Sequence, residues 1–121
     1  MTGEPDGLRR PPVEAIERHD GMVIIRLAGE LDLYNADEVG TALGEAAGEA
    51  PERLVVDLTE VSFVDSTALA ALVEAKKEVR PATQFVLAAP GTDVLRALEV
   101  SGLGQHFDIR DSVEDALAAQ R

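Results

Sequence analysis

The hydroxyl and carboxylate groups that could support chemistry gather in three short segments, residues 29–35, 59–67 and 89–92. Each segment follows an apolar run typical of a strand, and in parallel α/β sheets functional groups collect beyond the carboxyl ends of the strands. We therefore expect the three segments to meet at one edge of a sheet. The polar residues within and beside them are Asp32, Asn35, Asp57, Asp65, Ser66, Thr67 and Thr92.

This set of residues is not expected to form a catalytic site. A serine nucleophile needs a nearby base, but His19 and His106 lie in a predicted hairpin turn and beside a short predicted strand. The chain also has no Gly-x-Ser-x-Gly elbow and neither of the common glycine-rich phosphate-binding patterns. The carboxylates are better explained as helix caps and strand-end groups than as ligands of a divalent cation. The sequence therefore predicts a protein that is not an enzyme, with no catalytic residue, cofactor or metal.

Two residues could accept a phosphoryl group. Asp57 ends an apolar run, as does the phosphorylated aspartate of response-regulator receivers, but the acidic pair and the lysine of a receiver are not evident. Ser66 falls in the first turn of a predicted helix, where free N–H groups and the positive end of the helix dipole would accommodate a phosphate. Residue chemistry alone favours a plain helix cap at Ser66 over a phosphoacceptor.

The elements that must position these residues alternate between strands and helices, which predicts an α/β fold with a mixed sheet. Two β-rich runs around Asp20-Gly21 indicate a hairpin, and residues 29–32 are expected to break its second strand. Helices are expected to begin at Asn35 (with Glu38 completing a capping box), at Asp65 or Ser66, at Thr92 and at Asp111. The expected strands are Val13–Arg18, Met22–Ala28, Leu54–Leu58, Phe85–Ala89 and Phe107–Ile109, with Val23, Ile25, Leu27, Val55, Phe85 and Leu87 mostly buried.

Composition limits the choice of partners. The formal net charge is −12, which disfavours nucleic acid and anionic lipid as partners. It fits a protein partner with a basic face, or the excess carboxylates simply keep the protein soluble. No apolar run is long enough to span a membrane, and residues 1–12 resemble a flexible tail rather than a signal peptide. The absence of cysteine fits a reducing cytoplasm.

Three segments carry a resemblance to a known family. The run from Val55 to Leu69 resembles the signature of STAS domains, the anti-sigma factor antagonist family. Residues 29–32 resemble the loop after that family's second strand, and residues 101–103 resemble the end of its third helix. The resemblance implies a single STAS domain over residues 13–121, with an N-terminal hairpin, parallel strands and about four flanking helices.

The resemblance also implies a partner-switching function. In this family the unphosphorylated protein binds an anti-sigma factor, often a GHKL-type serine kinase, and a sigma factor is released. The kinase phosphorylates the serine that follows the aspartate, here Ser66, with Thr67 as the second choice, and a PP2C-type phosphatase restores binding. The residues expected to contact the partner are Asp32, Asn35, Asp65, Thr67, Ala68 and Leu69.

One departure from the family pattern leaves alternatives open. Ala68 stands where the family usually carries glycine. The added methyl group could hinder docking of a kinase while improving helix propensity by up to about 1 kcal/mol. A binding module that is never phosphorylated is therefore one alternative, and a STAS accessory subunit of a lipid-transporting ABC system is another.

Overall fold

The computed structural model describes residues 10–119 as one five-stranded sheet in the order β1-β2-β3-β4-β5. β1 pairs antiparallel with β2, and all other pairs are parallel, so the predicted mixed α/β fold is confirmed. The strands are β1 (Val13–His19), β2 (Met22–Leu31), β3 (Arg53–Val64), β4 (Gln84–Ala88) and β5 (Asp108–Arg110). The helices are α1 (Ala36–Gly48), α2 (Ser66–Glu78), α3 (Thr92–Val100), the short 3-10 helix η2 (Leu103–His106) and α4 (Val113–Ala118).

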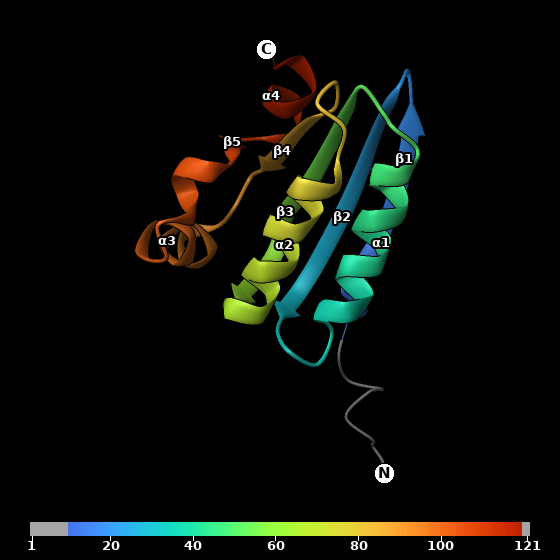
Figure 1. Cartoon of the computed structure of the whole chain (residues 1–121). Helices are drawn as coiled ribbons and strands as arrows, with labels where there is room; N and C mark the ends of the chain where they lie inside the picture. Colours follow the sequence, from blue (N-terminus) through green and yellow to red (C-terminus); the bar gives the residue numbers. More distant parts are fainter. Residues whose placement is uncertain (1–9, 120–121) are drawn as a thin grey trace.

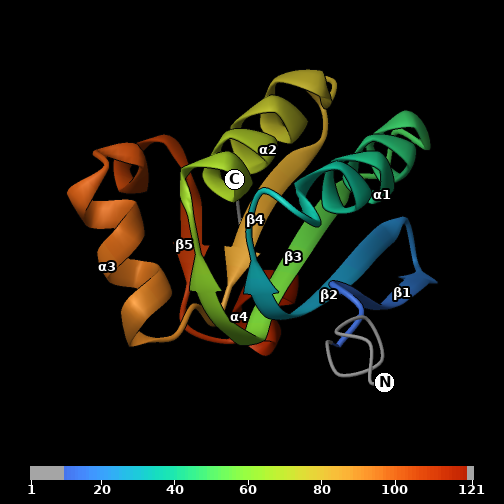
Figure 2. The ribbon, with the colours of Figure 1, turned by 90° about the horizontal axis from the view of Figure 1, so that it is seen from below.

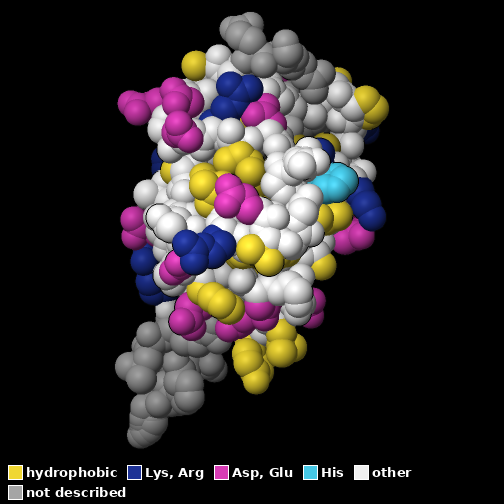
Figure 3. Space-filling view, turned by 90° about the vertical axis from the view of Figure 1, so that its left-hand side faces the viewer, with side chains coloured by type: hydrophobic (Ala, Val, Ile, Leu, Met, Phe, Trp, Pro, Cys, Tyr) yellow, Lys and Arg dark blue, Asp and Glu magenta, His cyan; other side chains and the backbone are white. Residues whose placement is uncertain are grey.

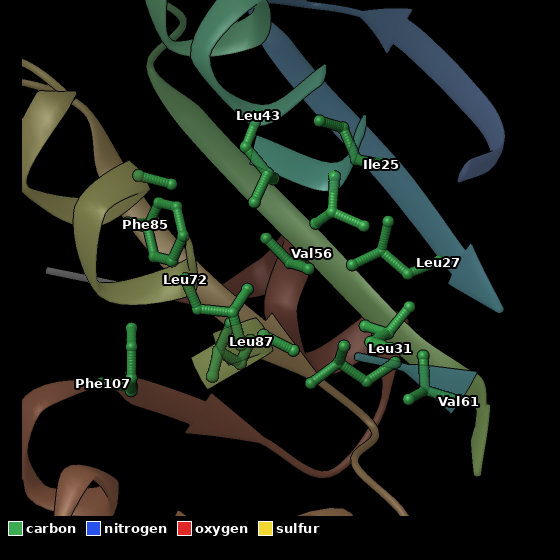
Figure 4. Packing of buried hydrophobic residues seen from close by; sticks show 14 of the residues in the cluster. Ile25, Leu27, Leu31, Leu43, Val56, Val61, Leu72, Phe85, Leu87 and Phe107 are labelled. Carbon is green, nitrogen blue, oxygen red and sulfur yellow. The ribbon is translucent and has the colours of Figure 1, made fainter. Parts of the chain in front are cut away.

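The helices lie on both faces of the sheet. Figures 1 and 2 show α1 and α2 side by side on one face, and α4 on the other. Successive strand residues point to opposite faces, so neighbours such as Val55 and Val56 enter different parts of the core. Val56 belongs to the large cluster beneath α1 and α2, shown in Figure 4. Val55 lies on the other face, where it packs with Ile24, with Val86 and with Ala116 of α4.

The predicted core is confirmed. Each of its six members has at most 5% of its surface exposed, and full burial of such a side chain contributes roughly 1.5–3 kcal/mol. The predicted hairpin is also present, because Asp20 and Gly21 both have positive φ between the paired residues His19 and Met22. Two positive φ angles are what a two-residue type I′ turn requires.

The two central strands are longer than the sequence indicated. β2 does not break at residues 29–32 but runs on to Leu31, and β3 does not end at Leu58 but continues to Val64. Gly29 permits the extension of β2, because its φ of 80° lets the strand bend without ending. The two extensions pair with each other as far as Leu31 and Val64, both of which are buried.

Several helix starts differ from expectation. Asp65 does cap α2, as one of the two expected starts, and Gly102 has a left-handed conformation after α3. The side chain of Asn35 does not cap α1, so the predicted capping box is wrong there. Gly91 precedes α3, and Thr92 is its first residue rather than its cap. Asp111 does not cap the last helix, because the hydroxyl of the next residue, Ser112, accepts the hydrogen bond instead.

The N-terminal tail was expected over residues 1–12, and residues 1–9 lie outside the described part of the chain. Two of the three remaining residues, Arg10 and Pro12, contact the domain. The carbonyl of Pro12 accepts a hydrogen bond of 3.0 Å from the Ala28 amide. Arg10 forms ion pairs with Glu14 and Glu60.

Candidate functional site

The paired extensions of β2 and β3 bring two of the three polar segments together. Because the strands are parallel and end at the partners Leu31 and Val64, the turn after β2 lies beside the start of α2. The amide of Asp65 donates a hydrogen bond of 3.1 Å to the Leu31 carbonyl, which joins the two segments directly.

Asp65 holds this junction with both carboxylate oxygens. Its Oδ1 accepts a hydrogen bond of 3.0 Å from the Ala68 amide and so caps α2. Its Oδ2 accepts one of 3.2 Å from the Leu33 amide, in the turn after β2. One side chain therefore fixes the position of the turn relative to the helix.

Asp32 and Asn35 shape the turn itself. The Asn35 Oδ1 accepts a hydrogen bond of 2.9 Å from the Asp32 amide, and its Nδ2 donates one of 2.9 Å to the Glu30 carbonyl. The Asp32 Oδ1 accepts one of 3.0 Å from the Tyr34 amide. The two side chains thus bind backbone groups and set which residues of the turn reach the surface.

The first residues of α2 divide between the surface and the core. Ser66 and Thr67 are exposed, and the N–H groups of a first helical turn have no intrahelical acceptor. Ala68 and Leu69 were predicted to contact a partner, but they are 2% and 6% exposed and belong to the core cluster. Their role in this structure is to pack α2 onto the sheet, because the helix turns these two positions inward.

Three large apolar side chains are exposed at the same end of the molecule as Ser66, and the sequence analysis missed them. Leu33, Tyr34 and Phe63 are 64%, 82% and 48% exposed. Figure 3 shows hydrophobic side chains projecting from the lower end of the molecule, where β2 ends and α2 begins in Figure 1. We call the surface formed by Leu33, Tyr34, Phe63, Ser66 and Thr67 the carboxyl-end face.

A bulge in β3 explains why Phe63 is exposed. Gly29 pairs with Val61 and Glu30 pairs with Phe63, so Ser62 has no partner in β2. An unpaired residue bends the strand and breaks the alternation of inward and outward side chains. Val61 and Val64 are buried as a result, and Phe63 faces solvent. The one signal in the sequence was the presence of Leu33 and Tyr34 in a predicted loop, where no core is available to cover them.

The third polar segment does not reach the carboxyl-end face. β3 pairs with β4 only as far as Asp57 and Ala88, so residues 89–92 leave the sheet before the extensions begin. Asp57 itself lies in the middle of β3 rather than at a strand end, and it is 7% exposed. Its Oδ1 accepts hydrogen bonds from the amide and the hydroxyl of Thr59, and its Oδ2 lies 3.8 Å from Nε of Arg26.

The segments that build the carboxyl-end face carry acidic but no basic side chains. Residues 27–41 and 54–75 contain no lysine, arginine or histidine, whereas Asp37 and Glu38 occupy the first turn of α1.

Between residues 10 and 119, no group of three or more histidine, cysteine, aspartate or glutamate side chains is arranged to hold a metal ion. No helix in the same range is both long and apolar enough to cross a membrane.

The fold is a mixed α/β sheet domain with an exposed face at one end, and comparison with known proteins gives its family. The STAS domain family matches residues 15–116, and the chain belongs to it. The resemblance noted in the sequence is thereby confirmed.

Individual relatives agree with this assignment. The chain is 35% identical over 100 residues to an anti-sigma-B factor antagonist of Listeria monocytogenes, covering 82% of this chain and 88% of that protein. It is 30% identical over 103 residues to an anti-sigma-F factor antagonist of Mycobacterium tuberculosis, covering 85% and 84%. The crystal structure of an anti-sigma factor antagonist from Mycobacterium paratuberculosis superposes with a TM-score of 0.81 at 30% identity, covering 86% and 89%.

A more distant likeness concerns the fold alone. Unphosphorylated SpoIIAA, also described as an anti-sigma factor antagonist, superposes with a TM-score of 0.72 at 23% identity, covering 85% of this chain and 91% of that one.

Proposed function

We propose that this protein is an anti-sigma factor antagonist that binds an anti-sigma factor through its carboxyl-end face and thereby releases a sigma factor. The observation that carries the proposal is the exposed Ser66 hydroxyl, set beside exposed apolar side chains in a chain 30–35% identical to proteins of that name. The proposed site of action is the cytoplasm, where bacterial transcription takes place.

The chemistry of the face indicates how a partner would be held. Interfaces gain most of their affinity from a few large, well-packed side chains, and aromatic residues are prominent among them. Tyr34 and Phe63 are suited to this role because their apolar surface is exposed, and its burial by a partner would be favourable. The acidic surround would accelerate encounter with a basic partner surface.

We further propose that phosphorylation of Ser66 switches binding off. A phosphate adds about −1.5 to −2 charges at pH 7, and the start of a helix accommodates it without unfolding. In a docked complex those charges would be desolvated next to the Asp65 carboxylate, at a cost of several kcal/mol. About 3 kcal/mol would weaken affinity more than a hundredfold. The kinase would be a GHKL-type anti-sigma factor, and a PP2C-type phosphatase would reverse the modification.

The burial of Ala68 supports phosphorylation over a constitutive binding module. The methyl group that replaces the usual glycine hydrogen is packed in the core, 2% exposed. It therefore adds no bulk to the surface on which a kinase would dock. Ser66 and Thr67 both remain accessible beside it, with Ser66 the first choice because it directly follows the capping aspartate.

The deciding experiment combines modification and binding. The protein is incubated with the cognate anti-sigma kinase and ATP, the modified residue is located by mass spectrometry, and both forms are titrated with the anti-sigma factor in the presence of ADP. We expect phosphate on Ser66 and affinity reduced more than about a hundredfold. Equal affinity of the two forms would instead identify a constitutive module, and phosphate confined to another residue would refute the assignment of Ser66.

A second experiment tests whether the protein acts only by binding. The purified protein is expected to show no turnover of nucleotides or esters, because residues 27–41 and 54–75, which build the carboxyl-end face, contain no histidine that could act as a general base for a hydroxyl nucleophile. Hydrolysis that disappears on substitution of Asp32 or Asp65 would contradict this.

A further inference from the structure

A cavity of about 340 Å³ lies between the second half of α2 and η2, away from the carboxyl-end face. Val73, Leu103 and Phe107 provide its apolar lining, and Lys76, Lys77 and His106 provide its nitrogen groups. Val73 and Leu103 are partly buried against the main core, and the Phe107 ring packs against Phe85 with 6.1 Å between the centroids. The apolar wall is therefore held by the fold.

The positive charge at this cavity is unusual for the chain. The net charge is −12, and Lys76 and Lys77 are the only lysines in the sequence. Both line the same cavity. Lysines in the last turn of a helix interact favourably with the helix dipole, and this accounts for their position along α2. It does not account for the apolar cavity between the two lysines and η2.

The nitrogen groups are placed at the cavity and remain available to a ligand. The Lys76 ammonium donates a hydrogen bond to the His106 carbonyl and lies 5.6 Å from the centre of the Phe107 ring, so it lies beside the apolar wall. The Lys77 Nζ lies 3.6 Å from the Glu74 Oε1, and both side chains are more than two-thirds exposed. This ion pair is therefore weak, and a ligand carboxylate could replace Glu74 in it. Within residues 10–119, the His106 imidazole forms no hydrogen bond.

We propose that this cavity binds a small amphipathic carboxylate, with the hydrocarbon part against Val73, Leu103 and Phe107 and the carboxylate beside Lys76 and Lys77. An apolar wall with a few convergent polar groups is the usual composition of a ligand site, and the volume falls at the lower end of the range of about 300–1,000 Å³ for such sites. A fatty carboxylate of medium chain length combines the negative head and apolar body that this lining complements. The inference is independent of the proposed phosphorylation.

The test is titration of the isotope-labelled full chain with decanoate, followed by amide NMR. We expect saturable shifts confined to residues 73–77 and 103–107. Decyltrimethylammonium and decanol have the same chain with a positive or a neutral head, and both should bind more weakly. Equal binding of the three compounds, or shifts centred elsewhere, would overturn the proposal.

Two variants that lose the same charge distinguish an effect of the lysine pair from an effect of the net charge on decanoate binding. Lys77→Gln removes one charge at the cavity without breaking the Lys76 hydrogen bond, and Arg96→Gln removes one charge from an exposed position on α3 that does not line it. We expect about a threefold weaker decanoate affinity for Lys77→Gln and no change for Arg96→Gln. Equal losses for the two variants would contradict the proposed site. Shifts at these residues with an acidic leucine-containing peptide, and none with decanoate, would show a protein-docking groove and refute the proposal.

Discussion

The two ends of α2 differ in the charge of the side chains that surround them. At its start, Ser66 and Thr67 are exposed beside large apolar side chains, in segments without a single basic residue. Toward its end, Lys76 and Lys77 line an apolar cavity. The helix has 13 residues and is thus about 20 Å long, which separates the two surfaces. The helix dipole favours a carboxylate at the start and cations at the end, but it does not expose hydrophobic groups. One helix therefore carries the proposed docking end and a second end of opposite charge.

The largest expected effect concerns charge at the docking end. Ser66→Asp should weaken binding to the anti-sigma factor by about a hundredfold, because the new carboxylate would be desolvated beside Asp65, whereas Ser66→Ala should bind like the unmodified protein. Isothermal titration calorimetry measures both. Thr92→Asp is the matched control, since it places the same charge on the exposed first residue of α3, off the carboxyl-end face. An equal loss for Thr92→Asp would mean that net charge, rather than position, controls binding.

Removal of the junction at the same end should lower stability. Asp65→Ala deletes the cap of α2 and the hydrogen bond to the Leu33 amide, and we expect a loss of about 2 kcal/mol in the free energy of unfolding. Urea denaturation followed by circular dichroism provides the measurement. Asp111→Ala removes an exposed aspartate that caps no helix, and it should change the free energy by less than about 0.5 kcal/mol. Similar losses in the two variants would refute the structural role of Asp65.

The apolar part of the docking end can be tested without a change in charge. Tyr34→Ala should reduce affinity for the anti-sigma factor about tenfold, because exposed aromatic residues are frequent anchors of interfaces. Unfolding in urea should be nearly unchanged, since the side chain is 82% exposed. Val100→Ala is the control, with a side chain that is 83% exposed on α3. Full affinity in Tyr34→Ala would place the docking surface elsewhere.

The smallest expected effect lies at β5, which provides a reference outside both ends of α2. The hydrogen bond from Arg110, assisted by one from Gln84, lowers the pKa of Asp108 below its ordinary value. A carboxylate whose pKa is lower in the folded state stabilises the fold above its unfolded pKa, near 3.9, and this contribution is lost as the pH falls through the folded pKa. Asp108→Asn should therefore be less stable than the wild type at pH 7 and closer to it at pH 3.

Denaturation of the two proteins at both pH values measures this difference. Asp111→Asn serves as the control, because Asp111 is exposed and forms no ion pair within residues 10–119. A stability difference between Asp108→Asn and the wild type that stayed constant from pH 7 to pH 3 would contradict the predicted role of the carboxylate charge.

The sequence alone determined the fold and the position of the serine. Local signals were sufficient here, because β-rich runs around Asp20-Gly21 define a hairpin, and alternating strands and helices imply parallel crossovers. The cap at Asp65 could also be predicted, since its side chain bonds to an amide only three residues along the chain.

Only the tertiary structure decided which residues reach the carboxyl-end face. The extensions of β2 and β3 exist because each supplies the hydrogen-bond partners of the other, which no local pattern reports. The bulge at Ser62 then turns Phe63 outward, and helix packing turns Ala68 and Leu69 inward. The cavity beside Lys76 likewise depends on η2 folding back against α2, a contact between residues about 30 positions apart. Side-chain direction at such places is set by long-range pairing and packing, so it could not be derived from residue types and spacing.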